Sequence, residues 1–525
     1  MHRLGRPETR SRRSVIRFAP AAALAALGIA ALGMAALSMA ALSMAPFARA
    51  GNVPVPPPFV GQPATPHPIH GIPPVPRNPF MAPNGRSEIH DDAWQTDAYT
   101  WAGPLGRAPI TRAATLGREC GSIAFDRRGR IVSVCVGLTG PELYMLDPNT
   151  LATLATFALP PRQSAPTNPF QDFTGGGYFY LDNHDRVVTS TTTHHIWVIA
   201  ETAGGPGFRR VRDYDLSRRL TAAENITSAL PDSRGWLWFV TKTDGIVGTI
   251  DLRTGAIHTV RLGHGALGEI ENSFATDTGG GVYIATNRKL YRFGADRHGR
   301  PRVVWQVTYP NSFEHKPGQV DDGTGTTPTV MPGGYVNITD NADPMDIVVY
   351  RTAARPTRLV RRHGRPRRVR AGRQVCRFPI FPRGQSADEN SLISAGRSMI
   401  AEDNFGYTDP TSVQGKTTAP GFVRVDLNRS GNGCHRVWEN DTLSAPTVVS
   451  KLALANGLVY TYTVDANNNW YWTALDFRTG QVVYQSYAGT GLGYNNNYAG
   501  ISIAPTGVEY LGTLGGIIAV RDSGG

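Results

Sequence analysis

The chain of 525 residues has little cysteine, few charged residues and no long apolar run beyond residue 50. Its 4 Cys are too few for a disulfide-dense miniprotein, and they show none of the C-x-x-C spacing that is typical of zinc sites. A membrane-spanning helix needs roughly 18 consecutive apolar residues, so no transmembrane domain is expected after residue 50. Because 41% of the residues are hydrophobic, the chain can build a large core, which excludes intrinsic disorder.

Negative charge is also scarce, and the positive charge is concentrated in two segments. The chain has 53 Lys and Arg against 41 Asp and Glu, a net charge of +12. Residues 1–50 carry seven Arg and one Glu, and residues 351–373 carry ten Arg and no acidic residue. The rest of the chain therefore has a net charge of −4. A mildly acidic body excludes a chain-wide basic groove, so we expect no nucleic-acid partner.

The first 50 residues have the pattern of an export signal. An Arg-rich start precedes an Ala-rich apolar run over residues 19–47, and Ala48-Arg49-Ala50 matches the small-x-small cleavage pattern. The segment Ser11-Arg12-Arg13-Ser14 resembles a twin-arginine signal, with ordinary secretion and an uncleaved anchor as alternatives. We therefore expect cleavage after Ala50 and a periplasmic or extracellular mature protein. No Cys precedes residue 120, which excludes a lipoprotein anchor.

Export to an oxidising compartment predicts two disulfides from the four cysteines, which allow three connectivities. Cys120 and Cys135 lie in neighbouring strand-like segments, so a hairpin would bring them face to face. The favoured pairing is Cys120 with Cys135 and Cys376 with Cys434.

The sequence changes character near residue 94. Residues 51–93 are rich in Pro and predict an extended, polyproline-like arm. From residue 94 to 525, short runs of Val, Ile, Tyr, Thr and Trp alternate with Gly, Asp and Asn, and helical periodicity is absent. This second part is therefore predicted to be all-β.

A repeat of roughly 40 to 55 residues predicts the architecture, because such periods are typical of propeller blades. Seven four-stranded units follow one another between residues 118 and 486, and a shorter unit covers residues 498–521. The short unit lacks an outer strand, which we expect residues 94–103 to supply. The prediction is a single closed β-propeller of eight blades with N- to C-terminal strand closure, which removes exposed sheet edges. Seven blades is the alternative.

The segment Ala474 to Tyr484 resembles the A-x-D-x-x-T-G-x-x-x-W docking motif of the quinoprotein alcohol dehydrogenase-like propellers, with Tyr in place of Trp. The resemblance implies a structural role, in which the Asp and Thr pin a turn and the aromatic ring packs between blades. The residues concerned are Asp251, Thr254, Gly255, Asp476, Thr479, Gly480 and Tyr484. The adjacent cysteines of the quinone site and a C-x-x-C-H haem motif are absent, which disfavours a quinone-dependent dehydrogenase.

Acid and amide pairs stand immediately before three predicted inner strands, and further Asp residues lie in loops expected on the same face. They are Glu224-Asn225, Glu271-Asn272 and Glu389-Asn390, with Asp321, Asp340 and Asp403. Inner strands converge on the axis, so these side chains predict a site for Ca²⁺ or a small ligand at the channel mouth. The pairs are loosely similar to the channel-mouth metal site of the gluconolactonase and senescence-marker propellers. The alternative is that they tie neighbouring blades through ordinary turn hydrogen bonds.

Motifs for catalysis are missing, since there is no G-x-S-x-G, H-E-x-x-H or P-loop sequence. His264 and His315 are candidate general bases if their loops fold toward the channel. The first functional hypothesis is an exported, cation-assisted hydrolase or lactonase. The alternative is a non-catalytic propeller at the cell envelope that binds a ligand or a protein. The insert from Arg351 to Arg373 is expected to be a solvated loop or a contact with an anionic surface.

Overall fold

The computed structural model describes residues 55–524, apart from residues 138, 163–168, 363–364, 409 and 412–413. The predicted export signal and its cleavage point lie outside the described residues. Within the described part, strands dominate, and the helical elements are the short 3-10 turns η2 (Pro169–Gln171), η3 (Gly265–Leu267) and η4 (Leu492–Tyr494). None of the described helices is long and apolar enough to cross a membrane.

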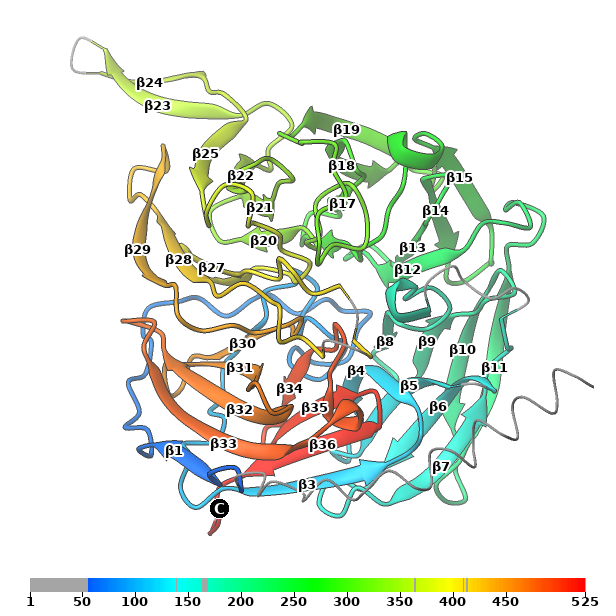
Figure 1. Cartoon of the computed structure of the whole chain (residues 1–525). Coiled ribbons are helices and arrows are strands. Elements are labelled where there is room, and N and C mark those ends of the chain that lie inside the picture. Colours follow the sequence, from blue (N-terminus) through cyan, green and yellow to red (C-terminus); the bar gives the residue numbers. More distant parts are fainter. Residues whose placement is uncertain are drawn as a thin grey trace, which may run out of the picture. The chain divides into compact units, whose positions relative to one another are not determined.

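Eight blades, each built on four antiparallel strands, follow one another in a ring, as Figure 1 shows, and the sheet of blade 7 carries the two additional strands β1 (Phe59–Gly61) and β2 (Ala98–Tyr99). Blades 1 to 4 are β4 (Glu119–Phe125), β5 (Ile131–Gly137), β6 (Gly140–Leu146) and β7 (Thr153–Ala158); β8 (Phe179–Leu181), β9 (Val187–Ser190), β10 (His195–Glu201) and β11 (Phe208–Asp215); β12 (Ile226–Pro231), β13 (Trp236–Thr241), β14 (Ile246–Asp251) and β15 (Ile257–Arg261); and β16 (Ala275–Thr276), β17 (Val282–Ala285), β18 (Lys289–Ala295) and β19 (Pro301–Thr308). Blades 5 to 7 are β20 (Thr329–Met331), β21 (Tyr335–Thr339), β22 (Asp346–Arg351) and β25 (Gln374–Pro379); β26 (Ile393–Ala395), β27 (Ser398–Glu402), β28 (Phe422–Leu427) and β29 (Cys434–Asn440); and β30 (Lys451–Ala453), β31 (Leu458–Val464), β32 (Asn469–Asp476) and β33 (Val482–Thr490).

Burial along each blade explains the sequence pattern. Every residue of β12 is buried, and so are five of the six residues of β13, because neighbouring blades cover both faces of these strands. An outer strand such as β11 is mostly exposed, and Tyr214 is its one buried residue. Between blades 3 and 4, the rings of Trp238 and Phe293 lie 6.2 Å apart. The core therefore consists of apolar layers between successive blades.

Blade 8 closes the ring with strands from both ends of the described chain. It contains β34 (Ile501–Ile503), β35 (Glu509–Thr513) and β36 (Gly516–Arg521), and its outer strand is β3 (Ile110–Thr115), antiparallel to β36. The prediction of an all-β propeller with eight blades is confirmed. The assignment of residues 94–103 to the outer strand was wrong. The mostly exposed side chains of β3 suit an outer strand, whereas β2 (Ala98–Tyr99) pairs in parallel with the inner strand β30.

The segment that precedes β3 contacts most of the ring. The strand β1 (Phe59–Gly61) pairs with β33 at the outer edge of blade 7. Residues 78–101, which we call the channel segment, run past the inner strands (Figure 1, blue). Backbone N–H groups of Phe125, Leu181, Thr276, Val330, Ser394 and Leu452 donate hydrogen bonds to its carbonyl groups. Because each of these donors lies on a different inner strand, the channel segment links blades 1, 2 and 4 to 7.

Both predicted disulfides are present. Cys120 and Cys135 are register partners on β4 and β5 of blade 1. The second bridge, between Cys376 and Cys434, joins the outer strands of blades 5 and 6.

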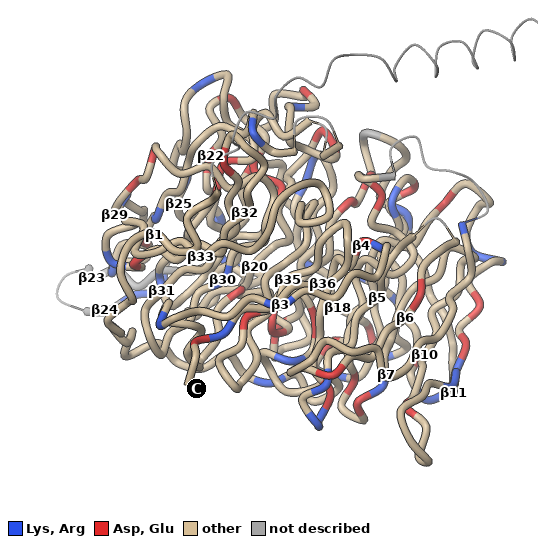
Figure 2. The backbone as a smooth tube through the Cα atoms, turned by 60° about the horizontal axis from the view of Figure 1, so that its bottom comes forward, with Lys and Arg blue, Asp and Glu red and all other residues tan. Residues whose placement is uncertain are grey.

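The Arg-rich insert is more regular than the expected loop. It forms a separate hairpin of β23 (Thr357–Arg362) and β24 (Arg365–Arg370) that projects from the ring in Figure 1. Leu and Val between the arginines supply the β-forming residues that an Arg-rich stretch otherwise lacks. Around the rest of the ring, acidic and basic residues are interspersed, as Figure 2 shows, in keeping with the small net charge of this part.

The docking-motif residues hold turns between outer strands. The Asp251 carboxylate accepts backbone N–H groups of Arg253 and Thr254 at 2.8 and 3.2 Å, and Asp476 accepts that of Arg478 at 2.7 Å. Gly255 and Gly480 have φ angles of 76° and 71°, which favour glycine. The Tyr484 ring packs on Phe59 of β1 with its centroid 5.6 Å away, so this aromatic residue secures the N-terminal segment.

Candidate functional site

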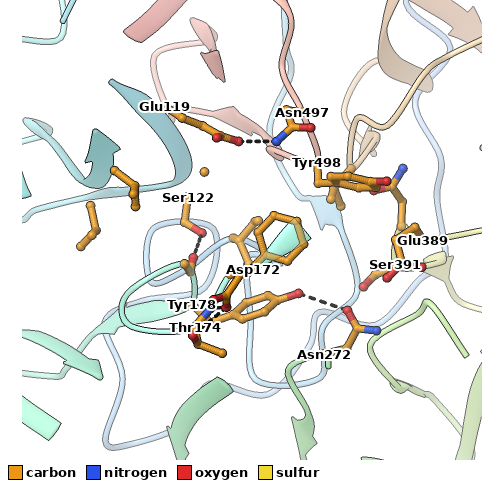
Figure 3. Close-up of a pocket in the computed structure, with 18 of the residues that line it drawn as sticks. Glu119, Ser122, Asp172, Thr174, Tyr178, Asn272, Glu389, Ser391, Asn497 and Tyr498 are labelled. Carbon is orange, nitrogen blue, oxygen red and sulfur yellow. Dashed lines mark hydrogen bonds between the residues drawn. The ribbon is translucent and has the colours of Figure 1, made fainter. Parts of the chain in front are cut away.

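A pocket opens at the end of the channel where the inner strands begin. Six blades line it with residues that stand at or just before an inner strand, and the channel segment contributes Ile89 and His90. Its polar lining comprises His90, Glu119, Ser122, Asp172, Thr174, Tyr178, Asn272, Glu389, Asn390, Ser391, Asn497 and Tyr498 (Figure 3). The empty space is about 830 Å³ when the open solvent at the mouth is included, so only part of it lies inside the pocket.

Local backbone geometry directs the blade 8 side chains into this pocket. Asn497 and Tyr498 have φ angles of 40° and 65°, a left-handed conformation that costs free energy and is retained where surrounding contacts enforce it. The Asn497 amide donates to Glu119 Oε1 at 2.7 Å and to the Phe170 carbonyl at 3.2 Å. The Tyr498 hydroxyl donates to the Gly318 carbonyl at 3.2 Å. These bonds fix the orientation of both side chains.

Three acidic groups of the pocket bind protons more tightly than usual. Burial raises the pKa of Glu119 to about 7, although the hydrogen bond from Asn497 opposes this shift. Burial and the nearby Asp321 raise the pKa of Glu389 well above its ordinary value. Burial also raises the pKa of Tyr178, whose hydroxyl donates to Asn272 Oδ1 at 3.2 Å. Near neutral pH the pocket therefore holds protonated groups that can donate hydrogen bonds.

Cationic side chains are absent among the described residues that line the pocket, apart from the titratable His90. Asp172 pairs with Arg162, which lies behind the lining. Val134, Val136, Phe173 and Val449 supply apolar surface. The arrangement suits a ligand that is neutral or positively charged and partly apolar, and it disfavours an anion.

Three of the predicted channel-mouth residues meet in this pocket: Asn272, Glu389 and Asn390. Glu389 Oε2 accepts the backbone N–H of Val320 at 3.1 Å. The Asn390 amide donates to Glu402 and to Asn404, and its own Oδ1 is buried without a hydrogen-bond partner.

Two further predicted acids lie behind the pocket lining. Glu271 forms an ion pair with Lys242 at 2.7 Å, and burial raises the pKa of Glu271 to about 7. Asp321 accepts the backbone N–H of Gly323 at 2.8 Å. Burial and the charge of Glu271 raise the pKa of Asp321 well above its ordinary value.

The remaining predicted residues are not brought to the pocket. The Glu224 carboxylate accepts the backbone N–H groups of Thr243 and Asp244. The Asp340 carboxylate accepts the N–H groups of Ala342 and Asp346. The Asp403 carboxylate accepts the N–H groups of Ala387 and Phe405. Asn225 is half-buried, and its carbonyl accepts the Lys242 N–H at 2.9 Å. These contacts are the turn and blade ties that the sequence analysis gave as the alternative.

His264 and His315 lie apart from the pocket lining. The His264 side chain contacts Asp244 and is 75% exposed. His315 Nδ1 lies 3.3 Å from Asp322 Oδ1, with the side chain 51% exposed. Both loops therefore expose their imidazole rings to solvent.

An acidic cluster that the sequence analysis did not identify lies in blades 1 and 2. One ligand atom from each of Asp126, Asp185 and Glu201 falls within 4.8 Å of the others, a spacing that could hold a metal ion. Arg130 contacts Asp126 and Glu201, and Arg127 contacts Asp185 at 3.2 Å. Arginine side chains therefore already balance much of the negative charge of this cluster.

Sequence reasoning missed most of the pocket. Glu119, Tyr178, Asn497 and Tyr498 stand at or before inner strands, as the Glu-Asn pairs do. Reading every inner-strand start, rather than repeated acid and amide pairs, would have found them. No sequence pattern points to His90, because its place in the channel depends on the path of an irregular segment.

No family model matches the chain. An uncharacterized protein from Archaeoglobus fulgidus is 25% identical over an alignment of 271 residues, which covers 47% of this chain and 51% of that protein. The chain thus matches about half the length of this curated relative.

Solved structures similar to the chain include streptogramin B lyase, with a TM-score of 0.38 and 10% identity over 79% of this chain and 97% of that one. Sqt1 from Chaetomium thermophilum has a TM-score of 0.48 and 12% identity over 79% of this chain and 100% of that one. Virginiamycin B lyase from Staphylococcus aureus has a TM-score of 0.36 and 11% identity over 68% of this chain and 96% of that one. These similarities concern the fold alone.

Proposed function

We propose that the protein is an exported β-propeller that binds a small neutral or cationic molecule in its channel pocket. One observation carries this proposal: six blades each contribute residues at the start of an inner strand to a single pocket, and the channel segment adds residues of its own. A purely structural channel would be filled by packed side chains. Here two hydrogen-bonded pairs, Asn497 with Glu119 and Tyr178 with Asn272, lie around open space.

The chemistry of the lining favours two ligand classes. Protonated carboxyl groups, amides and hydroxyls, with the aromatic Phe173 and Tyr498, suit a neutral molecule rich in hydroxyl or carbonyl groups. A divalent cation is the second candidate. Burial and the charge of Glu271 raise the pKa of Asp321, and burial and the charges of Asp321 and Glu271 raise the pKa of Glu389; a bound cation would offset both effects.

Filling the pocket tests the proposal. Gly121 lines it, and a Cβ at this position would meet no atom within 4 Å, so Gly121→Leu should occupy ligand space without disturbing the fold. The exposed Gly204 also has free space, and Gly204→Leu is the matched control. Thermal shifts would be measured with polyols, amines, lactones and CaCl₂. A ligand at a hundredfold excess over Kd stabilises the fold by about 2.7 kcal/mol.

We expect at least one probe to raise the melting temperature of the wild type and of Gly204→Leu, and to have no effect on Gly121→Leu. An equal shift in all three proteins would place binding elsewhere and would contradict the pocket assignment.

Export is the second part of the proposal, and it rests on residues 1–50. We expect the N-terminus of exported protein to begin at Gly51, as Edman sequencing or mass spectrometry would show. Replacing Arg12 and Arg13 by Lys should block export, since the twin-arginine route requires the arginine pair. Exported material that retains Met1 would refute cleavage, and unchanged export of the Lys variant would point to ordinary secretion.

A further inference from the structure

Three side chains, two of which line the pocket, form a chain of contacts that the sequence motifs do not reveal. His90 Nδ1 lies 3.1 and 3.2 Å from the two Asp97 carboxylate oxygens, and His90 Nε2 lies 3.4 Å from Ser391 Oγ. His90 and Ser391 line the pocket. We propose that Ser391 and His90 are catalytic residues, positioned by Asp97, that hydrolyse a carboxylic ester or lactone. This inference rests on the proposed binding of a small molecule in the pocket.

The contacts assign a role to each ring nitrogen of His90. Because Nδ1 faces only the Asp97 carboxylate, the Nδ1–H donates to it, and Nε2 is left as an acceptor. Asp97 is fully buried, and the ammonium group of Lys451 also contacts it. The His90 ring lies against Tyr178, with centroids 6.5 Å apart. The imidazole is therefore held in the orientation that a general base needs.

Two hydroxyls lie 3.4 Å from His90 Nε2, those of Ser391 and Thr327. Ser391 lines the pocket, and Thr327 is not among the described residues that do so. Ser391 Oγ also accepts the backbone N–H of Thr327 at 3.3 Å, so its own O–H is free to donate to His90. Ser391 is thus the hydroxyl that a bound substrate can reach. Its distance from His90 is within the range seen in empty sites, where such bonds tighten on substrate binding.

The reaction needs water as its only co-reactant. Ser391 Oγ attacks the carbonyl carbon while its proton passes to His90 Nε2. The C–O bond to the leaving alcohol breaks, and His90 returns the proton to that oxygen. A water molecule then gives a proton to His90 and attacks the acyl group, after which the carboxylic acid leaves and Ser391 Oγ regains its proton.

The negative oxygen that forms during attack needs a hydrogen-bond donor. Figure 3 shows the Tyr178 hydroxyl pointing toward Asn272, on the side of the pocket where Ser391 and Glu389 lie. Tyr178 is half-buried, and its hydroxyl donates to Asn272 Oδ1 at 3.2 Å. We assign this O–H to the oxyanion, which it would bind in place of Asn272.

The arrangement departs from the usual serine hydrolase motifs. The order along the chain is His90, Asp97, Ser391, and Ser391 stands in Glu-Asn-Ser rather than in G-x-S-x-G. Such triads are recognised by geometry and by role, and their order differs between unrelated folds. Asp97 has a φ of 55°, a strained conformation, which is common among residues that a functional site holds in place.

The test uses p-nitrophenyl acetate and butyrate as substrates and a fluorophosphonate as a serine-directed label, on the full mature chain. We expect the label to attach to Ser391, as peptide mass mapping would show. Ser391→Ala and His90→Asn should each lower kcat/KM by about 10³-fold or more. Thr327→Val, which removes the other hydroxyl near His90, should retain labelling and activity. Circular dichroism melting curves confirm that each variant is folded.

Asp97→Asn tests positioning separately. It should lower kcat and move the acidic limb of the kcat/KM profile to lower pH, because loss of the carboxylate disfavours the imidazolium. A merely structural role would leave the position of that limb unchanged.

The outcomes separate this inference from the proposed function. Wild-type protein that binds a pocket ligand and neither hydrolyses the esters nor takes the label would overturn the triad and leave the binding function standing. If the wild-type protein bound no ligand in the pocket, both the proposed binding function and the triad would be contradicted. Labelling at Thr327, or full activity of folded Ser391→Ala, would overturn the assignment of the nucleophile.

Discussion

At the scale of single residues, the channel region concentrates carboxyl groups whose environment favours the protonated form. Glu402, the last residue of β27, is 5% exposed. It accepts hydrogen bonds from Ser450 at 2.6 Å and from the amides of Asn390 and Asn404. Burial raises its pKa from 4.5 to about 8 in spite of these bonds. Stability should therefore depend on pH through this residue.

The sign of that dependence follows from proton binding. Between pH 4.5 and about 8, Glu402 of the unfolded chain has lost a proton that the folded protein retains. The folded state then binds more protons, so the free energy of unfolding falls as pH rises, by up to about 1.4 kcal/mol per pH unit for this group. Glu402→Gln should show a smaller loss of stability between pH 5 and 8.5 than the wild type.

Urea unfolding at several pH values would measure this difference. The exposed Glu314→Gln is the control and should follow the wild type. Parallel pH curves for the wild type and Glu402→Gln would contradict a protonated Glu402 in the folded protein.

At the scale of elements, the two disulfides restrain different parts of the ring. The bridge between Cys120 and Cys135 lies within blade 1, and its neighbours Glu119, Gly121 and Val134 line the pocket. The bridge between Cys376 and Cys434 joins the outer strands of two blades, far along the chain from those residues.

Removing either bridge by paired Cys→Ala changes should lower the free energy of unfolding by about 2–4 kcal/mol, because the unfolded chain gains conformational freedom. Since the blade 1 bridge adjoins the pocket, its loss should also weaken ligand-induced thermal shifts, and loss of the other bridge should not. Urea titrations and thermal shifts measure the two effects. Equal binding in both variants would show that the blade 1 bridge does not support the pocket.

At the scale of the whole molecule, two features close and stabilise the ring. Strand β3 completes blade 8, and the channel segment hydrogen-bonds to the inner strands of six blades. The segment also brings buried acidic side chains to Lys451, whose ammonium group contacts Asp97 and lies 3.7 Å from Asp91. Without it, Lys451 would be a buried charge without partners, which costs several kcal/mol.

A chain that begins at residue 104 should therefore fail to form a stable monomer, although it retains all eight blades. A chain that begins at residue 77 keeps the channel segment and loses only the contacts of β1 and its neighbours, so it should fold with a lower melting temperature. Size-exclusion chromatography and circular dichroism would compare the two. Equal melting temperatures would show that the channel segment is dispensable.

The blade repeat, the eight-bladed ring and both disulfide pairs were predictable from the sequence. These features depend on local patterns: strands of a few residues, Asp and Gly at turns such as Asp476 to Gly480, and Cys120 and Cys135 on neighbouring strands. Once those two cysteines are paired, Cys376 and Cys434 are left for each other. The pocket was predictable only in part. Asn272, Glu389 and Asn390 reach it, whereas Glu224 and Asp403 bind the N–H groups of nearby turns.

What the sequence by itself determined is thus the type, number and order of the blades, because alternation and turn chemistry act over short distances along the chain. Tertiary structure decided which polar side chains face the channel, because a carboxylate beside an inner strand can bind a nearby backbone N–H or project to the axis, and the packing of the adjacent blade selects between these. Tertiary structure also brought His90 and Asp97 to Ser391, about 300 residues further along the chain. That contact depends on the path of the channel segment, which has no repeating pattern and is held by hydrogen bonds to six separate blades.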